Sequence, residues 1–517
     1  MTEATEKKSL TMRFLDGVER ACRKLPPPAI LFCLLFVITA VIGWLCVMGD
    51  VSVVNPANGK TVTAQNLFST KGVEWLLTNL TKNFTGYAPM GLVMCMTLTI
   101  GLCDESGLLK ALIQKYLRNV PPSLMAYVVG FIGVMGNIAS NTAYVVVPPL
   151  AAVAFLGVGK NPIAGMIASF AGCSAGFTAN MLIAGTDSLV AGLTNDAIKG
   201  FLGAESTFRV DVTCNWYFMM ASTFLCALVI GWVNNHIVEP RLGKYEGDAD
   251  TSGVQDLTPE QKLGLKRAAL GSLVFIAIIL VGYFWGPLGL TKSGARKFIG
   301  SAFLSGLIPI LFFFFAVPGI LYGYTVGSFK SSADVNKAMV RQTAAVGSFV
   351  VLCFFAGQFQ GLFNWTRLGT ILAIEGANFL KGIGFTGIPM CVCFIFVAAC
   401  INILISSSAA KWAILAPLFV PMFMLMGYHP GFTQLLYRLG DSPSNCISPL
   451  SAYVWMMLSV VQAKYNKDAH IGTMLSNLVP YFLALQIIWV TFFIIWAYAG
   501  IPIGPGVTMT LPAGILP

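Results

Sequence analysis

Residues 140–174, SNTAYVVVPPLAAVAFLGVGKNPIAGMIASFAGCS, and residues 408–442, SAAKWAILAPLFVPMFMLMGYHPGFTQLLYRLGDS, align without gaps at an offset of 268 positions. Eight of the 35 pairs are identical, and most are Ser, Pro or Gly, which interrupt helices inside otherwise apolar segments. Paired broken segments in two halves of a chain point to the binding site of a secondary transporter. The alternative is chance agreement, because Gly, Ser and Pro are common here. We predict a duplicated element, inverted if an odd number of spans separates the copies.

The composition is that of a polytopic membrane protein. Of 517 residues, 56% are hydrophobic and 10% are charged, which leaves too little charge to cover a soluble globule. Many apolar runs are near spanning length, but several are short or contain Pro and Gly. We expect an all-α polytopic membrane protein with about nine transmembrane helices plus two re-entrant helical hairpins, arranged as an inverted repeat.

The basic residues indicate the orientation in the membrane. The net charge of +10 invites a nucleic-acid partner, but six Lys and Arg residues precede the first span, which instead predicts a cytoplasmic N-terminus and no nucleic-acid binding. No cleavable signal pattern is visible, so we expect a multi-pass protein of the inner (plasma) membrane in contact with lipid. The predicted domains are a cytoplasmic segment (1–24), a first membrane half (25–238) with a hairpin near 136–157, a cytoplasmic linker (239–267), and a second membrane half (268–517) with a hairpin just before or around 406–412.

The chain lacks the residue patterns of most enzymes. Its 13 Cys have no metal-ligand spacing and it has only three His, so a zinc site built from these residues is not expected. No phosphate-binding loop of the Gly-x4-Gly-Lys-Ser/Thr type occurs. An enzyme would need clustered His, Cys or carboxylates, and a channel would place charged or carbonyl rings on an oligomer axis. We expect no enzyme activity and no cofactor, and transport would depend on a Na+ or H+ gradient.

The first copy begins at the polar run Gly136-Asn137-Ile138-Ala139-Ser140-Asn141-Thr142. Small and amide side chains favour turns over helix interiors, so this run predicts the tip of a re-entrant hairpin. Oxygen atoms at such a tip suit a hard monovalent cation. An ordinary polar turn outside the membrane is the alternative. The candidate substrate contacts are Asn137, Ser140, Asn141 and Thr142.

The second copy carries Ser406-Ser407-Ser408-Ala409-Ala410-Lys411-Trp412 at the matching place, and Trp412 aligns with Tyr144. Serine hydroxyls and an indole beside a helix break could hold a ligand with an aromatic or amide group. A tryptophan that anchors the membrane interface or fills the core is the alternative. The candidate contacts are Ser407, Ser408 and Trp412.

Each copy is followed by a second polar break, and both breaks resemble a span that unwinds midway. The first ends in Phe177-Thr178-Ala179-Asn180, and the second reads Gly440-Asp441-Ser442-Pro443-Ser444-Asn445. We predict that Asn180 and Asn445 contact the substrate.

Three ionisable residues lie beside these breaks, where each costs about 2.5–3.5 kcal/mol at the bilayer centre. Arg438 suits a substrate carboxylate in bidentate fashion, and Asp187 and Asp441 suit Na+ or a proton. Alternatively, Arg438 and Asp441, three apart on one helical face, neutralise each other. Glu375, Lys381 and Lys411 are weaker candidates, because such long side chains can snorkel to water.

These residues resemble the p-aminobenzoyl-glutamate transporter (AbgT) family over nearly the whole chain. The likeness is strongest at Phe363-Asn364-Trp365, at Trp412-Ala413-Ile414-Leu415-Ala416-Pro417 and at the final Gly500-Ile501-Pro502-Ile503-Gly504-Pro505-Gly506. The resemblance implies a homodimer of protomers with nine transmembrane helices and two hairpins, in which a transport domain slides against a scaffold. It carries family site residues onto Asp187, Trp412, Pro430, Arg438 and Asp441.

Two positions depart from the family pattern. Ala409 stands where relatives have Ser three positions before the tryptophan, so Ser408 would have to supply that hydroxyl. Asn141 stands where relatives have an acidic residue, yet Ser140-Asn141-Thr142 resembles the tip of sodium-coupled dicarboxylate carriers. The resemblance thus leaves two coupling ions open, a Na+ near Ser140, Asn141 and Asp441, or a proton.

Two functions are predicted. In the first, the protein is an ion-coupled secondary transporter of p-aminobenzoyl-glutamate, or of a related aromatic-acyl amino acid derived from folate, with elevator-type alternating access. Arg438 would bind a carboxylate and Trp412 would pack on the benzoyl ring. In the second, it is a proton-driven efflux pump for sulfonamide antimetabolites, which lack the glutamate carboxylates and would use Arg438 less.

Overall fold

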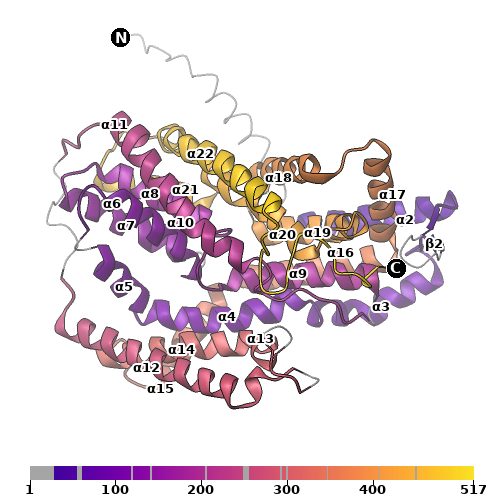
Figure 1. The fold of residues 1–517 in the computed structure, drawn as a ribbon, viewed down its shortest axis with the longest axis horizontal. Coiled ribbons are helices and arrows are strands. Elements are labelled where there is room, and N and C mark those ends of the chain that lie inside the picture. Colours follow the sequence, from indigo (N-terminus) through magenta and orange to yellow (C-terminus); the bar gives the residue numbers. More distant parts are fainter. Residues whose placement is uncertain are drawn as a thin grey trace, which may run out of the picture.

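The computed structural model describes residues 28–54, 61–117, 120–139, 142–203, 206–247, 256–291, 294–297, 301–345, 347–405, 407–448 and 451–516. These residues are mainly helical (Figure 1). The first half contains α2 (Pro28–Met48), β1 (Ser52–Val54), β2 (Thr61–Thr63), α3 (Thr70–Thr85), α4 (Ala88–Glu105), α5 (Leu108–Leu117), α6 (Met125–Met135), η1 (Gly136–Ala139), α7 (Thr142–Gly157), α8 (Pro162–Ala175), α9 (Gly185–Leu202), α10 (Trp216–Val233), η2 (Asn234–Val238) and α11 (Glu239–Leu242). The second half contains α12 (Pro259–Phe284), η3 (Pro287–Gly289), α13 (Ala302–Ser305), α14 (Leu307–Val326), α15 (Ser332–Ala345), α16 (Gly347–Trp365), α17 (Leu368–Gly382), α18 (Gly387–Leu404), α19 (Ser408–Leu425), α20 (Pro430–Ser444), η4 (Asn445–Ile447), α21 (Ala452–Lys464) and α22 (Ile471–Tyr498).

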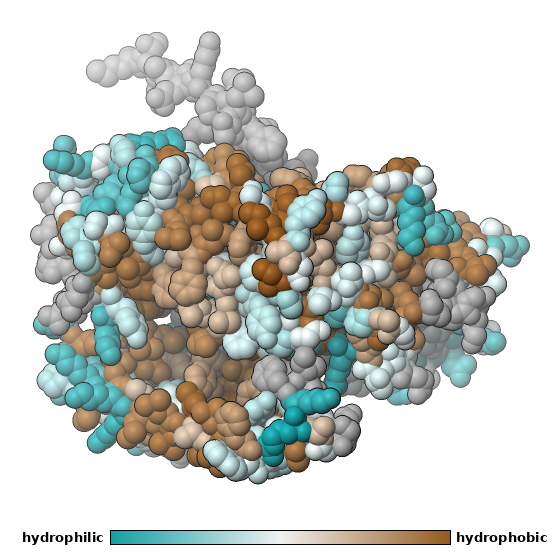
Figure 2. Space-filling model, in the orientation of Figure 1, coloured by the Kyte–Doolittle hydropathy of each residue, from teal (hydrophilic) through white to brown (hydrophobic). Residues whose placement is uncertain are grey.

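Several helices are built to cross a membrane. Within the described part of the chain, six helices are long and apolar enough to span a bilayer, or seven if the bent pair α15–α16 forms one span. Apolar side chains of α12, including Leu270, Leu273 and Ile278, are exposed as lipid-facing residues would be. Figure 2 shows broad apolar areas across this view, with hydrophilic residues along its left edge and further hydrophilic groups at the lower right and right. The multi-pass architecture is confirmed, while the count of nine spans stays a prediction, because four further apolar helices in the described part of the chain are only 10–17 residues long.

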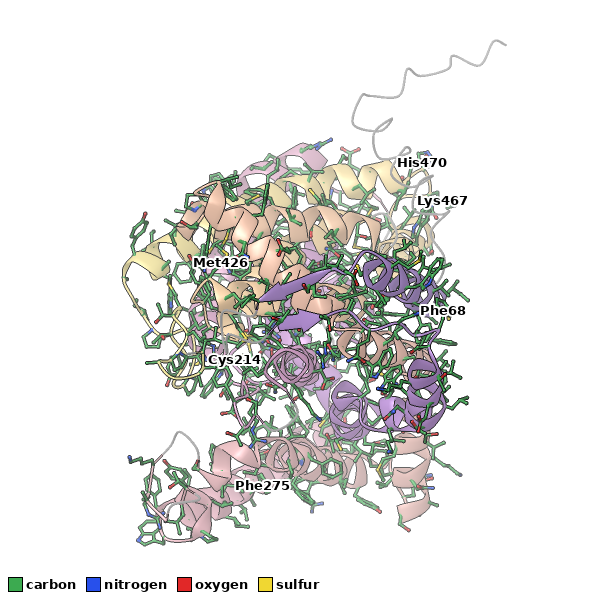
Figure 3. The ribbon with its side chains drawn as sticks, turned by 90° about the vertical axis from the view of Figure 1, so that its right-hand side faces the viewer. Phe68, Cys214, Phe275, Met426, Lys467 and His470 are labelled. Atoms are coloured by element: carbon green, nitrogen blue, oxygen red, sulfur yellow. The ribbon has the colours of Figure 1, made fainter. Side chains whose placement is uncertain are left out.

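The helices form two layers, and the core lies in the larger one. Helix α14 packs on α4 and on α12, and α12 also contacts α5. Figure 3 shows Phe275 of α12 in this layer, below the body that holds Cys214 and Met426. In that body every residue of α8 and α20 is buried. These two short helices are therefore the centre of the molecule.

The two copies of the duplicated element fold into the same series of parts. Each has a helix pair around a break (α6–α7 and α18–α19), a buried short helix (α8 and α20), a second break, and two further helices (α9–α10 and α21–α22). Helices end and begin again near 136–142 and 404–408, where the sequence predicts hairpins, although Ser140, Asn141 and Ser406 themselves lie outside the described residues. That these breaks are re-entrant hairpins stays a prediction. An inverted relation between the copies stays a prediction.

The identical residues of the repeat build the same turn twice. Gly159 and Gly427 both adopt positive φ, +72° and +87°, which glycine tolerates best. The next residue donates its backbone N–H to the carbonyl of Phe155 in the first copy and of Phe423 in the second, at 2.9 Å in each. The same hydrogen bond ends other helices of this chain, from Phe385 to Leu380 and from Val51 to Cys46, so the shared turn agrees with duplication but does not exclude chance agreement.

The same turn caps α8 and α20 in the same way. Asn161 Oδ1 accepts from the N–H of Ile163, and His429 Nδ1, 268 positions later, accepts from the N–H of Gly431, both at 3.0 Å. His429 lies between α19 and α20, outside the membrane-spanning helices, and burial lowers its pKa from 6.5 to about 4. The native protein therefore holds this imidazole neutral.

This capping histidine predicts a pH dependence of stability. Because its folded pKa is lowered, its contribution is complete above pH 6.5 and is lost as the pH falls to about 4, where the loss reaches about 3 kcal/mol. The variant His429→Asn keeps a capping acceptor, as Asn161 does, but cannot titrate. Its Tm should fall less than that of the wild type on acidification, measured by thermal unfolding. If the Tm of both proteins falls equally as the pH is lowered, the prediction is contradicted.

The predicted linker, 239–267, is helical at both ends. Helix α11 continues α10 through the π-helical turn η2, and α12 begins at Pro259. Thr258 and Gln261 form a reciprocal capping box at that start. The charged residues after Pro259 therefore extend a membrane helix beyond its apolar part, while residues 248–255 lie outside the described residues.

Candidate functional site

The two second breaks meet at the centre of the protein. Thr178, in the break between α8 and α9, donates its hydroxyl hydrogen to the carbonyl of Arg438 at 2.8 Å. The same hydroxyl contacts that of Ser442. Both contacts are fully buried, so residues 260 or more positions apart join the two halves. Non-helical backbone in an apolar core persists only where such partners satisfy it.

A buried ion pair crosses this junction. Arg438 Nη2 of α20 lies 2.5 Å from Asp187 Oδ1 of α9. The carboxylate also accepts from the N–H of Ala184 at 2.7 Å, in the first turn of α9, where the helix dipole favours negative charge. The guanidinium lies 4.9 Å from the ring centroid of Phe177, a cation–π contact. Its Nε has no partner among the described residues, so the site holds a buried donor that remains open.

A second ionic centre surrounds Asp441, one turn further along α20. Its side chain forms an ion pair with Lys411 of α19. It also accepts from Ser408 Oγ at 2.7 Å, from Asn445 Nδ2 at 3.1 Å and from the Tyr437 hydroxyl at 3.2 Å. The carboxylate is fully buried. It thus links the start of the second hairpin helix to α20.

Two sequence interpretations need correction here. Arg438 and Asp441 do not neutralise each other, because each pairs with a residue from another helix. Lys411 does not snorkel to water, since it is fully buried against Asp441 and Asn402. Glu375 and Lys381, the other weak candidates, are exposed, and Lys381 donates to the carbonyl of Leu425.

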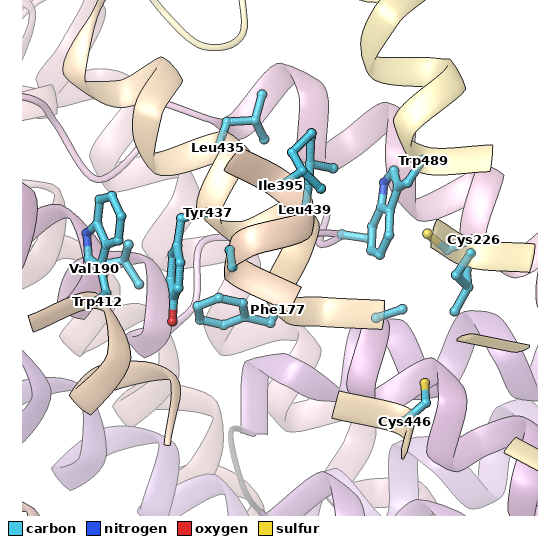
Figure 4. Close-up of a cluster of buried hydrophobic side chains, with 14 of the residues drawn as sticks. Phe177, Val190, Cys226, Ile395, Trp412, Leu435, Tyr437, Leu439, Cys446 and Trp489 are labelled. Atoms are coloured by element: carbon cyan, nitrogen blue, oxygen red, sulfur yellow. The ribbon is translucent and has the colours of Figure 1, made fainter. Parts of the chain in front are cut away.

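Trp412 is buried beside this centre and stacks on Tyr437 (Figure 4). The ring centroids are 4.5 Å apart with an interplanar angle of 20°. The indole N–H donates to Thr194 Oγ1 at 3.0 Å, and Thr194 donates to Gln434. Figure 4 shows Tyr437 between Trp412 and Phe177. One face of the indole is therefore covered by a protein ring in this conformation.

The other predicted residues lie around the same breaks or outside the described part. Asn137 is buried and bonds Thr186, and the Nδ2 of buried Asn180 has no partner among the described residues. Ser407 caps α19, and Pro430 is the first residue of α20. Ser140 and Asn141 lie outside the described residues, as does the side chain of Thr142.

Sequence reasoning missed three partners of these residues. Asn402, near the end of α18, accepts from Lys411 and donates to the carbonyl of Asp441 at 2.9 Å. A lone amide in an apolar helix was a usable signal. Tyr437 lies four positions before Asp441, a spacing that predicts contact on one helical face. Thr178 gave no signal beyond its place in the break.

Comparison with known proteins shows the family to which this chain belongs. Residues 13–511 match the model of the AbgT putative transporter family. The chain is 37% identical to the p-aminobenzoyl-glutamate transport protein of Escherichia coli over 95% of its length and 96% of that protein.

Two solved structures have the same fold. The YdaH transporter of Alcanivorax borkumensis matches with a TM-score of 0.87 and 32% identity, over 93% of this chain and 100% of that one. MtrF of Neisseria gonorrhoeae, described as illuminating a class of antimetabolite efflux pumps, matches with a TM-score of 0.88 and 36% identity, over 96% of this chain and 100% of that one. Both matches extend over more than nine-tenths of the chain.

Proposed function

Because the chain belongs to the AbgT putative transporter family, we propose that it is an ion-coupled secondary transporter of p-aminobenzoyl-glutamate or a related aromatic-acyl amino acid. It moves the substrate across the inner membrane without a chemical step, as a homodimer with a cytoplasmic N-terminus. Alternating access is of the elevator type, in which the body containing α8, α9, α19 and α20 slides against the remaining helices. The identity to a protein named for this substrate supports the assignment.

The observation that carries the proposal is the Arg438–Asp187 pair at the junction of two broken helices. A buried guanidinium is the side chain best suited to grip a carboxylate, because its planar fork matches both oxygens. Its unpartnered Nε leaves one donor open for a ligand. In the proposed bound state a glutamate carboxylate of the substrate shares Arg438 with Asp187, or displaces it.

The aromatic part of the substrate has a site beside this one. Trp412 and Tyr437 form a stacked pair next to Asp441 and Ser408. When the second hairpin opens, an aminobenzoyl ring replaces Tyr437 on the face of Trp412. Aromatic rings favour such offset stacking, and the neighbouring amides of Asn445 and Asn180 offer polar partners.

A second function is favoured by one comparison. The likeness to MtrF, a protein described with antimetabolite efflux pumps, supports proton-driven export of sulfonamides. A sulfonamide shares the aminophenyl ring but has no glutamate carboxylates. It would depend on the Trp412 site and little on Arg438.

Uptake into proteoliposomes tests the first function. Purified protein should accumulate radiolabelled p-aminobenzoyl-glutamate when an ion gradient is imposed, and the gradient's dissipation should stop uptake. Free p-aminobenzoate, which lacks the glutamate carboxylates, should compete poorly. No uptake under either a Na+ or a H+ gradient, together with sulfonamide resistance in an expressing strain, would replace the first function by the second.

A further inference from the structure

Lys411 is the feature of the site that transport of the substrate does not explain. Of the Asp, Glu, Lys and Arg side chains that the structure describes, four are buried, namely Asp187, Lys411, Arg438 and Asp441. Arg438 forms an ion pair with Asp187, and Lys411 forms an ion pair with Asp441. A buried lysine is costly and is retained only with a partner and a role. Since an uncharged side chain would fill the same space, the charge itself needs an explanation.

The ammonium of Lys411 lies among oxygen ligands. Its Nζ contacts Asp441 Oδ1 from α20 and Asn402 Oδ1 from α18. Helix α18 ends at Leu404, so the negative end of its dipole points to this place. Carboxylate and amide oxygens beside a half-helix C-terminus are the surroundings in which secondary transporters hold a coupling Na+. The ammonium thus occupies a position suited to a monovalent cation.

The remaining polar groups of this centre are already arranged for a cation. The other oxygen of Asp441 is held by Ser408 and Asn445, which fixes the carboxylate's orientation. Asn402 donates both amide hydrogens to α20 and η4, including one to Ser444 Oγ at 2.7 Å, so its oxygen must face Lys411. The cradle would keep its shape if another cation replaced the ammonium.

The first copy of the repeat has no such cradle. At an offset of 268, Lys411, Asp441 and Asn402 correspond to Ala143, Cys173 and Val134, all uncharged. The cation position therefore arose in the second copy only, and it was filled by a side chain of the chain itself.

We propose that Lys411 is a tethered cation: its ammonium occupies the monovalent-cation position formed by Asp441 and Asn402, so that Na+ does not bind there. The proposal refines the proposed ion-coupled function by removing Asp441 from the candidate Na+ ligands. What it means for ion coupling rests on that proposed function. It also assigns Lys411 as a residue that determines cation selectivity. Its chemistry requires that loss of the ammonium leaves a vacant, negatively charged site of the right type for Na+.

The test measures cation binding without transport. Thermal unfolding of the purified full-length protein is followed in NaCl and in choline chloride at equal ionic strength. The Tm of the wild type should be the same in both salts. The Tm of Lys411→Ala should rise by about 2–4 °C in Na+ over choline, because Na+ then binds only the folded state.

Three control variants separate the cradle from general effects. Lys411→Arg keeps the positive charge and should show no Na+ response, and Lys411→Ala with Asp441→Asn should lose the response. Lys381→Ala, which removes an exposed lysine bonded to the other end of α19, should behave as the wild type does.

Each outcome decides the proposal. A Na+ response in the wild type that Asp441→Asn abolishes would overturn it, and so would a Lys411→Ala protein that is equally stable in both salts. If Lys411→Ala can be purified only with Na+ present, the proposal is supported; if it fails in both salts, it is overturned, since Na+ should replace the lost charge. Failure of substrate uptake would refute the proposed function and leave this result unaffected.

Discussion

Replacing Arg438 with methionine is expected to abolish uptake and to destabilise the protein by about 3–5 kcal/mol, because Asp187 would remain buried without its partner. The double variant Arg438→Met with Asp187→Leu should recover most of that stability, since no unpaired charge remains, but it should still not transport. Thermal unfolding and proteoliposome uptake of the four proteins of this cycle give the two readouts separately.

A matched pair at the surface provides the control. Lys160 Nζ lies 2.8 Å from Glu239 Oε2, and the two side chains remain 17% and 23% exposed. Lys160→Met should therefore cost about 1 kcal/mol or less and leave uptake intact. If the Arg438/Asp187 double variant transports at the wild-type rate, the pair is only structural and the substrate carboxylate binds elsewhere.

The sequence predicts the frame of this protein well, because the frame depends on local chemistry. Pro162 and Pro430 start helices, Gly159 and Gly427 supply positive φ, and these residues act on the backbone wherever the helix lies. The breaks could therefore be located without knowing what surrounds them.

Partners across the core could not be predicted in the same way. The spacing of Arg438 and Asp441 suggested one local pair, but Asp187 of the distant helix α9 pairs with Arg438, and Lys411 of the preceding helix α19 pairs with Asp441. Such choices depend on which helices pack together, and a single sequence carries no direct record of that packing. Lys411 was undervalued for this reason, since snorkelling is the usual fate of an isolated lysine.

The identities between the two aligned segments do not mark the residues of the candidate site. The identical positions shape turns and caps, whereas Lys411, Arg438 and Asp441 correspond to Ala143, Phe170 and Cys173. The aligned segments thus share their turns and caps, while these three charges occur in the second segment alone. Candidate functional residues in such a chain are therefore best sought where the copies differ.

Replacing Trp412 with phenylalanine is expected to raise the KM for p-aminobenzoyl-glutamate severalfold at a stability cost of only about 1 kcal/mol. The phenyl ring retains stacking on Tyr437 but offers a smaller face to a substrate ring and loses the hydrogen bond to Thr194. Alanine at this position should cost about 3–5 kcal/mol, because the indole is fully buried. Thermal unfolding and uptake kinetics measure the two effects.

Trp489 is the control for this prediction. It is also buried and donates its indole N–H to a hydroxyl, that of Ser222, at 2.9 Å. Figure 4 shows it apart from the Trp412–Tyr437 stack. Trp489→Phe should thus lose about as much stability as Trp412→Phe while keeping the wild-type KM. Equal kinetic effects in both variants would mean that Trp412 is a packing residue, because only direct contact with the substrate separates affinity from stability.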